Sequence, residues 1–245
     1  MLHGRSAVSD YLNELAARLE EVLGDALLGA YAGGSLALRG FEPASSDIDV
    51  TAVMRGRLEA ERRQALVQRI RSSVLPVPAR GLEFVLYAGD RLADDLRRPA
   101  FELELNDGPG MPFRSHGGLD ERPAEDGAFW YGLDLSIVRQ SGIVLIGPRP
   151  EEVIPVVPPD VLADLLRESV AWHLAQAGEG PNQTLNLVRA LAFARTGRWI
   201  AKPDAAKLPE ASEPLPRLAE RTVQEIDRAF GGGLDDGFAE RSGLL

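Results

Sequence analysis

The sequence contains no cysteine and only three histidines, His3, His116 and His173. Disulfide bonds and thiolate metal sites are therefore excluded, and histidines this few and scattered do not indicate a zinc site. Any bound metal ion would have to be held by carboxylate oxygens. Long apolar stretches are also absent, because runs such as 85–88 fall far short of the roughly 20 residues that a membrane span requires.

Positive charge is in short supply, with 27 lysines and arginines against 37 aspartates and glutamates, a net charge of −10. A protein that binds duplex nucleic acid normally carries a basic face, so we expect no nucleic-acid partner. The negative field instead attracts cationic small molecules. The first residues lack a basic segment followed by an apolar core, so we expect no secretory signal, no membrane partner and a cytoplasmic protein.

Apolar spacing and turn residues predict alternating helices and strands over the first 150 residues. We expect helices at 9–23, 57–72 and 129–140, and strands at 26–32, 47–54, 82–87, 101–106 and 143–146. Strict alternation in the fourth strand is typical of a sheet edge, with Glu102 and Glu104 on its solvated face. Residues 107–127 show no periodicity and are expected to form a long loop of functional importance.

Strand signals end after the prolines between residues 148 and 159, and the remaining periodicity is helical. Helices are expected at 161–174, 184–195 and 215–230. We therefore expect an α/β (α+β) domain over residues 1–157, followed by a small all-α domain over residues 158–245.

One constellation of residues indicates chemistry rather than folding. Asp47 and Asp49 would point to the same face of their strand, because side chains alternate along a strand with a period of two. Glu83 is isolated in an apolar strand, and if that strand is a neighbour, three carboxylates converge on one volume. Only cations make such a volume tolerable, and Mg²⁺ commonly shares its ligand shell with substrate phosphates.

Upstream of these carboxylates, Gly33, Gly34 and Ser35 stand where a predicted strand gives way to a helix. Backbone N–H groups and the helix dipole attract phosphate at such a turn, and glycine allows the backbone to approach it closely. A phosphate cradle beside a carboxylate metal site is the machinery of nucleotidyl transfer.

These residues resemble the signature of the polymerase-β-like nucleotidyltransferases, in which Gly-Ser is followed by Ser-Asp-x-Asp and then by a strand glutamate. The order of elements from about residue 30 to about residue 207 is similar to the aminoglycoside adenylyltransferases that modify streptomycin and spectinomycin. Further stretches that match this family are residues 133–137, 144–148 and 196–198, the last followed by Lys202. The resemblance implies a nucleotidyltransferase domain with a mixed β-sheet, whose cleft is closed by a C-terminal helical bundle.

The resemblance also assigns roles to individual residues. It implies that the phosphates of ATP, the co-substrate, are bound by Gly34, Ser35, Ser46, Arg189 and Lys202. It implies a Mg²⁺ site, with two ions expected, at Asp47, Asp49 and Glu83. Glu83 matches the base that takes the proton from the drug hydroxyl as it attacks the α-phosphorus, and whether it also ligates metal stays open.

The acceptor is expected to contact the start of the helix near 182–195. Asn182, Asn186 and Arg189 share a polar face there at spacings of four and three. Family members that accept streptomycin carry Trp and Asp determinants just before this helix. Here Glu179 can replace one acidic contact but the Trp is displaced, so Glu179 and Asn182 are the candidate substrate contacts and spectinomycin is favoured over streptomycin.

The leading hypothesis is therefore Mg²⁺-dependent transfer of AMP from ATP to a hydroxyl of a cationic aminoglycoside or aminocyclitol antibiotic, by a monomeric enzyme. A second hypothesis keeps the chemistry and changes the acceptor to a protein side chain, a tRNA end or another metabolite. A third is a non-catalytic nucleotide-binding module of the same fold.

Overall fold

A computed structural model of the chain describes residues 2–123, 126–176, 180–231 and 236–242. Six strands form one mixed sheet in the order β5-β4-β3-β2-β1-β6. The strands are β1 (Leu27–Ala32), β2 (Ile48–Met54), β3 (Leu82–Ala88), β4 (Phe101–Gly108), β5 (Met111–His116) and β6 (Ile143–Ile146). Only β2 and β3 run parallel, and the other neighbours are antiparallel.

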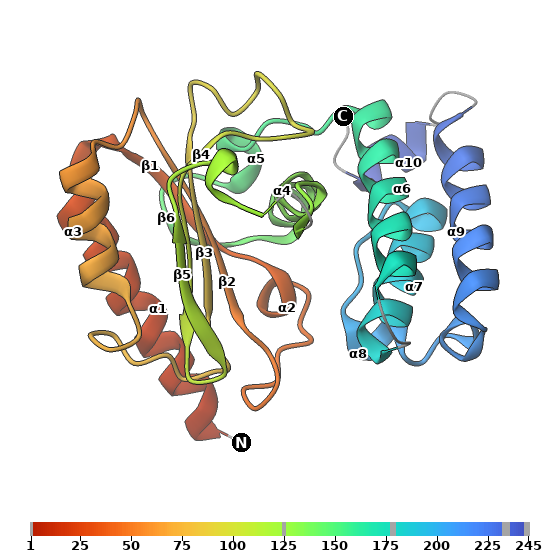
Figure 1. Ribbon diagram of the computed structural model, residues 1–245, viewed down its shortest axis with the longest axis horizontal. Helices are drawn as coiled ribbons and strands as arrows, with labels where there is room; N and C mark the ends of the chain where they lie inside the picture. Colours follow the sequence, from red (N-terminus) through yellow and green to blue (C-terminus); the bar gives the residue numbers. More distant parts are fainter. Residues whose placement is uncertain (1, 124–125, 177–179, 232–235, 243–245) are drawn as a thin grey trace.

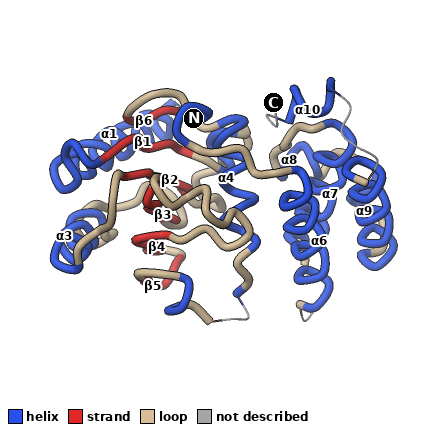
Figure 2. Tube along the Cα trace, turned by 90° about the horizontal axis from the view of Figure 1, so that it is seen from above, coloured by secondary structure: helices blue, strands red, loops and turns tan. Residues whose placement is uncertain are grey.

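Helices cover both faces of this sheet (Figures 1 and 2). On one face lie α1 (Leu2–Leu23) and α3 (Ala60–Ile70), and on the other lies α4 (Phe129–Ser141). Leu15, Leu66 and Phe84 are fully buried between the first pair of helices and the sheet. Burying this apolar face stabilises the layer by roughly 25 cal/mol for each Å² removed from water.

After β6 the described residues form helices and the loops that join them (Figure 1). The long helices are α6 (Pro159–Ala175), α7 (Pro181–Thr196) and α9 (Leu215–Phe230), and the short ones are α5 (Pro150–Val153), α8 (Lys202–Ala205) and α10 (Asp236–Ser242). The apolar core beneath α4 continues into α6, α7 and α9, so the sheet layer and the helical region pack against each other. None of the described helices has the length and apolar character needed to cross a membrane.

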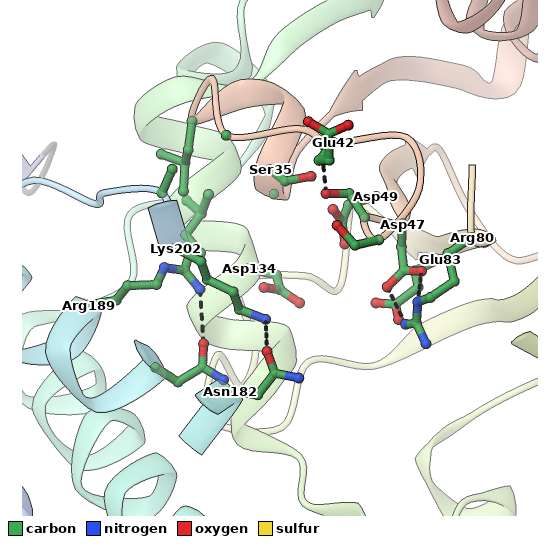
Figure 3. Close-up of a pocket in the computed structure, with 18 of the residues that line it drawn as sticks. Ser35, Glu42, Asp47, Asp49, Arg80, Glu83, Asp134, Asn182, Arg189 and Lys202 are labelled. Atoms are coloured by element: carbon green, nitrogen blue, oxygen red, sulfur yellow. Dashed lines mark hydrogen bonds and ion pairs between the residues drawn. The ribbon is translucent and has the colours of Figure 1, made fainter. Parts of the chain in front are cut away.

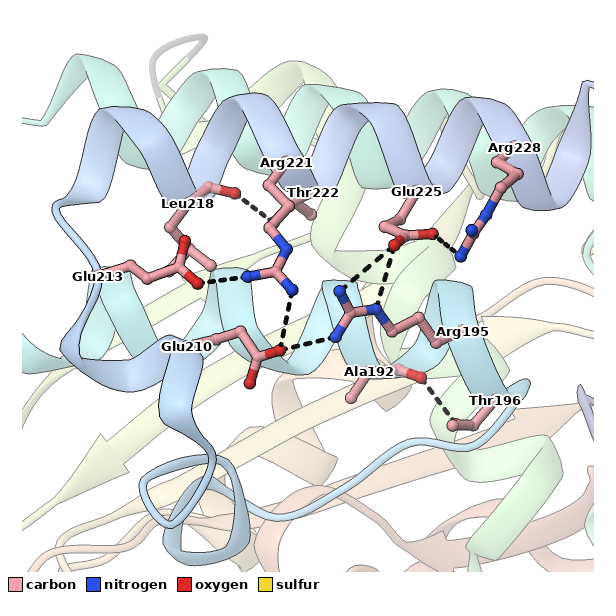
Figure 4. A network of polar contacts seen from close by, with 10 residues as sticks. All are labelled: Ala192, Arg195, Thr196, Glu210, Glu213, Leu218, Arg221, Thr222, Glu225 and Arg228. Atoms are coloured by element: carbon pink, nitrogen blue, oxygen red, sulfur yellow. Dashed lines mark hydrogen bonds and ion pairs between the residues drawn. The ribbon is translucent and has the colours of Figure 1, made fainter.

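A network of ion pairs joins α7, α9 and the turn between them (Figure 4). Arg195 of α7 donates to Glu210 at 2.7 Å and to Glu225 of α9 at 3.3 Å. Arg221 also contacts Glu210, at 3.5 Å, and Glu213. Partly exposed pairs each contribute little free energy, about 1 kcal/mol or less, so the network chiefly fixes how the two helices align.

The structure corrects the interpretation of residues 101–127. β4 is not an edge strand, because β5 forms beside it within the stretch expected to be a loop. Glu104, which pairs with His116 of β5, is consequently buried at 7% exposure, and Glu102 is buried at 4% rather than solvated. Each has a partner: Glu102 accepts the backbone N–H of Leu58, and Glu104 lies 2.9 Å from the ring of His116.

Candidate functional site

The parallel pairing of β2 and β3 brings the central carboxylates together. Asp49 stands directly opposite Glu83 in the register, and Asn106 of β4 is the next residue across. Asp47 lies just before β2. These four side chains line one cavity of about 750 Å³ between the sheet and the helical region. The two aspartates and the strand glutamate therefore meet in space as expected.

The turn after β1 fits tightly against Asp49. Gly34 opens α2 (Gly34–Ala37) with a φ of +48°, a left-handed conformation that favours glycine. A Cβ on Gly34 would lie 1.9 Å from Oδ2 of Asp49, so only glycine fits. With four residues α2 has little macrodipole, and the phosphate-binding capacity of this turn rests on its backbone N–H groups and on Ser35.

Two serines predicted to bind phosphate line the same cavity. The Oγ of Ser35 is buried without a hydrogen-bond partner in the described protein, a costly arrangement that a bound ligand would relieve. The Oγ of Ser46 accepts the backbone N–H of Glu42 at 3.0 Å, which closes the turn before Asp47. In Figure 3 Ser35 lies beside Asp49.

The cavity repels anions at its centre. Burial, reinforced by the charges of Asp134 and Asp47, raises the pKa of Asp49 to about 7. Burial, reinforced by Asp49 and Asp47, raises the pKa of Glu83 to about 8. Both shifts mean that the ionised carboxylates lack sufficient positive charge around them, and a cation bound between them would supply it.

The carboxylates are not arranged as a ready-made metal site. Among the described residues, no group of three or more Asp, Glu, His or Cys side chains is placed to hold a metal ion. Asp47 instead pairs with an arginine, because its two oxygens accept hydrogen bonds from Nε and Nη2 of Arg80 at 2.6 and 2.5 Å. Hard carboxylate oxygens and the unpartnered Ser35 hydroxyl nevertheless fit the chemistry of Mg²⁺.

Positive charge enters the cavity from the helical region (Figure 3). Arg189 of α7 is held by the backbone oxygen of Ile200 at 2.8 Å and by Asn186 at 3.2 Å, and its guanidinium lies over Trp199. Lys202, at the start of α8, donates to Asn182 at 3.2 Å. Burial lowers the pKa of Arg189 and of Lys202, which shows that each loses solvent contact in this position.

Comparison with known proteins agrees with this geometry. No protein-family model matches the chain. Aminoglycoside (3'') (9) adenylyltransferases of Escherichia coli and Klebsiella pneumoniae are each 29% identical to it over 249 aligned positions, covering 97% of the chain and 90% of the relative. The Rhizobium radiobacter enzyme is 28% identical over 97% of the chain and 88% of its own length. Over nearly its whole length the chain is therefore similar to aminoglycoside (3'')(9) adenylyltransferases.

A solved structure supports the fold independently. The chain is similar to the crystal structure of spectinomycin adenyltransferase AAD(9) from Enterococcus faecialis with ATP and spectinomycin, with a TM-score of 0.65. The identity is 19%, and the match covers 97% of this chain and 95% of the other. This likeness concerns the fold, a mixed sheet with helices followed by a helical region, and it confirms the fold class expected from the motifs.

The candidate ATP, metal and acceptor residues divide between two sides of the cavity. From the sheet side come Gly34, Ser35, Ser46, Asp47, Asp49 and Glu83, and from the helical side come Asn182, Arg189 and Lys202. Glu179 lies outside the described residues. The structure thus brings all the described candidates to one place.

The sequence interpretation missed several residues that line the same cavity. Trp130, Asp134 and Ile137 occupy one face of α4, at helical spacings of four and three. Burial raises the pKa of Asp134 to about 7, and the charge of Glu83 acts in the same direction. Asp134 falls within 133–137, one of the stretches that carried the family resemblance, and its spacing from Trp130 was the available signal.

Arg80 and Arg122 were also missed, because they reach the cavity from loops. No periodicity marks a loop residue as facing a site, so only the packing of the folded chain could identify them.

Proposed function

We propose that this protein transfers AMP from ATP to a hydroxyl of an aminocyclitol antibiotic and releases pyrophosphate, and that spectinomycin is preferred to streptomycin. Three observations support the proposal: the paired Asp49 and Glu83, the unpartnered hydroxyl of Ser35, and the cations Arg189 and Lys202 facing them. ATP and spectinomycin are the ligands in the structure of the related AAD(9) enzyme.

The pairing of Asp49 with Glu83 is the main support for the proposal, because it places a base, Glu83, beside a site for a cation. We assign to Glu83 the removal of the proton from the acceptor hydroxyl. The hydroxyl oxygen then forms a bond to the α-phosphorus while the bond to the departing pyrophosphate breaks. A general base placed in this way contributes about 100- to 10,000-fold to such reactions.

Mg²⁺, with two ions expected, would be held by Asp47, Asp49 and Glu83 and would neutralise the triphosphate and orient it. Asp47 could take part only after leaving Arg80. Ser35, Ser46 and the N–H groups around Gly34 would bind phosphate oxygens from the sheet side. Whether Glu83 acts as base, metal ligand or both is a question that its variants answer.

Arg189 and Lys202 would complete the phosphate site from the helical side. We propose that the chain divides near residue 157 into a catalytic domain and a helical domain that closes over the cleft. Support comes from the strands, which all precede residue 147 in the described chain, and from α6, which begins at Pro159. Glu179 and Asn182, near the start of α7, are the proposed substrate contacts of this domain.

The experiment that tests the proposal is pyrophosphate release by the purified protein with Mg-ATP and single acceptors. Release with spectinomycin and weaker release with streptomycin is the expected result. Absence of release with spectinomycin, streptomycin and related aminocyclitols would overturn it.

A further inference from the structure

The register of the sheet defines an acceptor side of the cavity. Moving across β2, β3 and β4, the neighbours are Asp49, Glu83 and Asn106. Ser35 lies on the Asp49 side, at the end of β1, where the nucleotide phosphates are proposed to bind. We therefore expect a hydroxyl that gives its proton to Glu83 to approach from the opposite side, toward β4, where Asn106 and Arg122 line the cavity.

Arg122 is held in place by several groups on this side. Its Nη1 donates to the hydroxyl of Tyr131 at 2.5 Å, and its guanidinium lies 5.1 Å from the centre of the same ring. Its Nε lies 3.4 Å from Glu104, and its Nη2 lies 3.7 Å from Asp126. The side chain of Arg122 is only 15% exposed, so these contacts restrict its conformation.

The anchor of Arg122 is itself buried. Glu104 has 7% exposure and lies 2.9 Å from Nδ1 of His116, which belongs to the neighbouring strand β5. A charged carboxylate is placed in the interior only when a partner compensates its charge, and here Arg122 does so while the His116 ring lies within hydrogen-bond distance. The cluster therefore fixes a cation at the wall of the cavity.

Arg122 retains donors for a ligand. A guanidinium has five N–H donors and no acceptor, and one hydrogen bond within the described residues, to Tyr131, uses one of them. Its Nε–H is buried beside Glu104 and does not face the cavity, so the donors left for a ligand are those of Nη1 and Nη2 that Tyr131 does not use. Such a group donates hydrogen bonds to neutral or anionic oxygen atoms of a ligand. It repels an ammonium or guanidinium group of a ligand.

We propose that Arg122 is a specificity-determining residue for the acceptor, which donates to hydroxyl, ether or carbonyl oxygens and disfavours acceptors that present a cation to this wall. The inference rests on the proposed function, since it deepens the description of the same site. Glu104 is a positioning residue that acts through Arg122. The favoured acceptor class is an aminocyclitol whose amines lie on one ring and whose remaining rings carry only oxygen functions.

Binding of two antibiotics tests the proposal. Spectinomycin fits this class, whereas streptomycin carries guanidinium groups. Titration calorimetry would measure both with the full-length protein, Mg²⁺ and an ATP analogue that has a methylene group between the α- and β-phosphorus atoms. The wild type is expected to bind spectinomycin at least about 10-fold more tightly than streptomycin, since hydrogen bonds to charged groups have this magnitude.

Arg122→Met is expected to raise the Kd for spectinomycin about 10-fold. The Kd for streptomycin should stay unchanged or fall, and the Kd for the ATP analogue should stay unchanged. Arg114→Met is the matched control, because Arg114 also contacts Asp126, at 3.9 Å, but does not line the cavity. If Arg122→Met fails to fold, Arg122→Lys is the second variant, because it keeps the charge and loses the planar guanidinium. It should weaken the binding of spectinomycin, while the binding of streptomycin stays weak. Glu104→Gln should weaken spectinomycin in the same direction and less strongly.

A spectinomycin-to-streptomycin Kd ratio that is the same in the wild type and in the Arg122 variants would overturn the inference, as would a wild type without preference for spectinomycin. Failure of the proposed function looks different. In that case the wild type binds spectinomycin in an Arg122-dependent way but transfers no AMP to it.

Discussion

Arg80 and Asp47 form a two-pronged ion pair at the edge of the cavity, with Nε and Nη2 of the arginine on the two oxygens of the aspartate (Figure 3). The hydrogen bond to Asp47 raises the pKa of Arg80, so the arginine stays charged. Asp47 therefore begins the reaction cycle bound to a protein cation. We infer that Mg-ATP must displace Arg80 before Asp47 can ligate metal.

Replacing Arg80 tests this competition. Arg80→Gln should lower the Mg²⁺ concentration for half-maximal activity about 3- to 5-fold, because an exposed ion pair contributes up to about 1 kcal/mol. Arg55→Gln, at an exposed arginine just after β2, is the control and should leave the Mg²⁺ dependence unchanged. The competition is refuted if Arg80→Gln needs as much Mg²⁺ as the wild type, or more.

The glycine turn can be tested with a matched pair of alanine variants. Gly34 and Gly56 both have positive φ, +48° and +72°, so alanine costs each of them backbone strain of about 1–2 kcal/mol. A Cβ at Gly56 meets nothing within 4 Å, whereas one at Gly34 collides with Asp49. Gly34→Ala should therefore lose at least about 100-fold in AMP transfer, while Gly56→Ala should lose only stability. Equal activity of the two variants would show that the turn does not shape the site.

The two lysines of the chain offer another matched pair. Lys202 faces the carboxylates from α8, whereas Lys207 pairs with Asp204 outside the cavity. Lys202→Met should raise the KM for ATP about 10-fold or more without changing the melting temperature, because a charge-assisted contact to phosphate is lost. Lys207→Met should leave the KM for ATP at the wild-type value. A normal KM in Lys202→Met would remove that residue from the phosphate site.

The buried position of His173 leads to a prediction of how the stability of the protein depends on pH. It is buried among Trp130 and Trp172, neither ring nitrogen has a hydrogen-bond partner in the described residues, and burial followed by the charge of Lys202 lowers its pKa to about 4. The unfolded chain binds the proton at the ordinary pKa of 6.5, so stability is full above pH 6.5 and is lost as the pH falls toward 4.

The loss attributable to His173 between pH 7 and pH 5 should be about 2 kcal/mol in the free energy of unfolding. Urea titrations at the two pH values would measure it. His173→Phe keeps an aromatic ring and removes the titrating group. Its free energy of unfolding should therefore fall by about 2 kcal/mol less than that of the wild type between pH 7 and pH 5. If the variant and the wild type lose equal stability, the histidine is not the source.

Much of the fold follows from periodicity. The strand over 143–146 and the helix over 215–230 are found at the predicted residues, because clear apolar spacing is bounded by glycine or proline in both. The predicted strand 82–87 extends by one residue in β3, and the helix predicted at 184–195 begins earlier, at Pro181. Ends of elements depend on caps and tertiary contacts, which spacing does not record.

β5 shows why the remaining part could not be predicted. Its residues, Met111–His116, are exposed or half-buried, and no apolar alternation distinguishes them from a loop. The strand forms because β4 offers hydrogen-bonding groups along its edge, and it then buries Glu104. That burial creates the anchor of Arg122, so the acceptor wall depends on a pairing that the local sequence does not reveal.

The central claim, that Glu83 serves AMP transfer to an antibiotic hydroxyl, is tested most directly by the mass of spectinomycin after incubation with Mg-ATP and enzyme. The wild type should convert it to a product heavier by one AMP. Glu83→Gln should still bind ATP and should form this product at least about 100-fold more slowly. An unmodified drug after incubation with the wild type, or equal rates for the two proteins, would contradict the account.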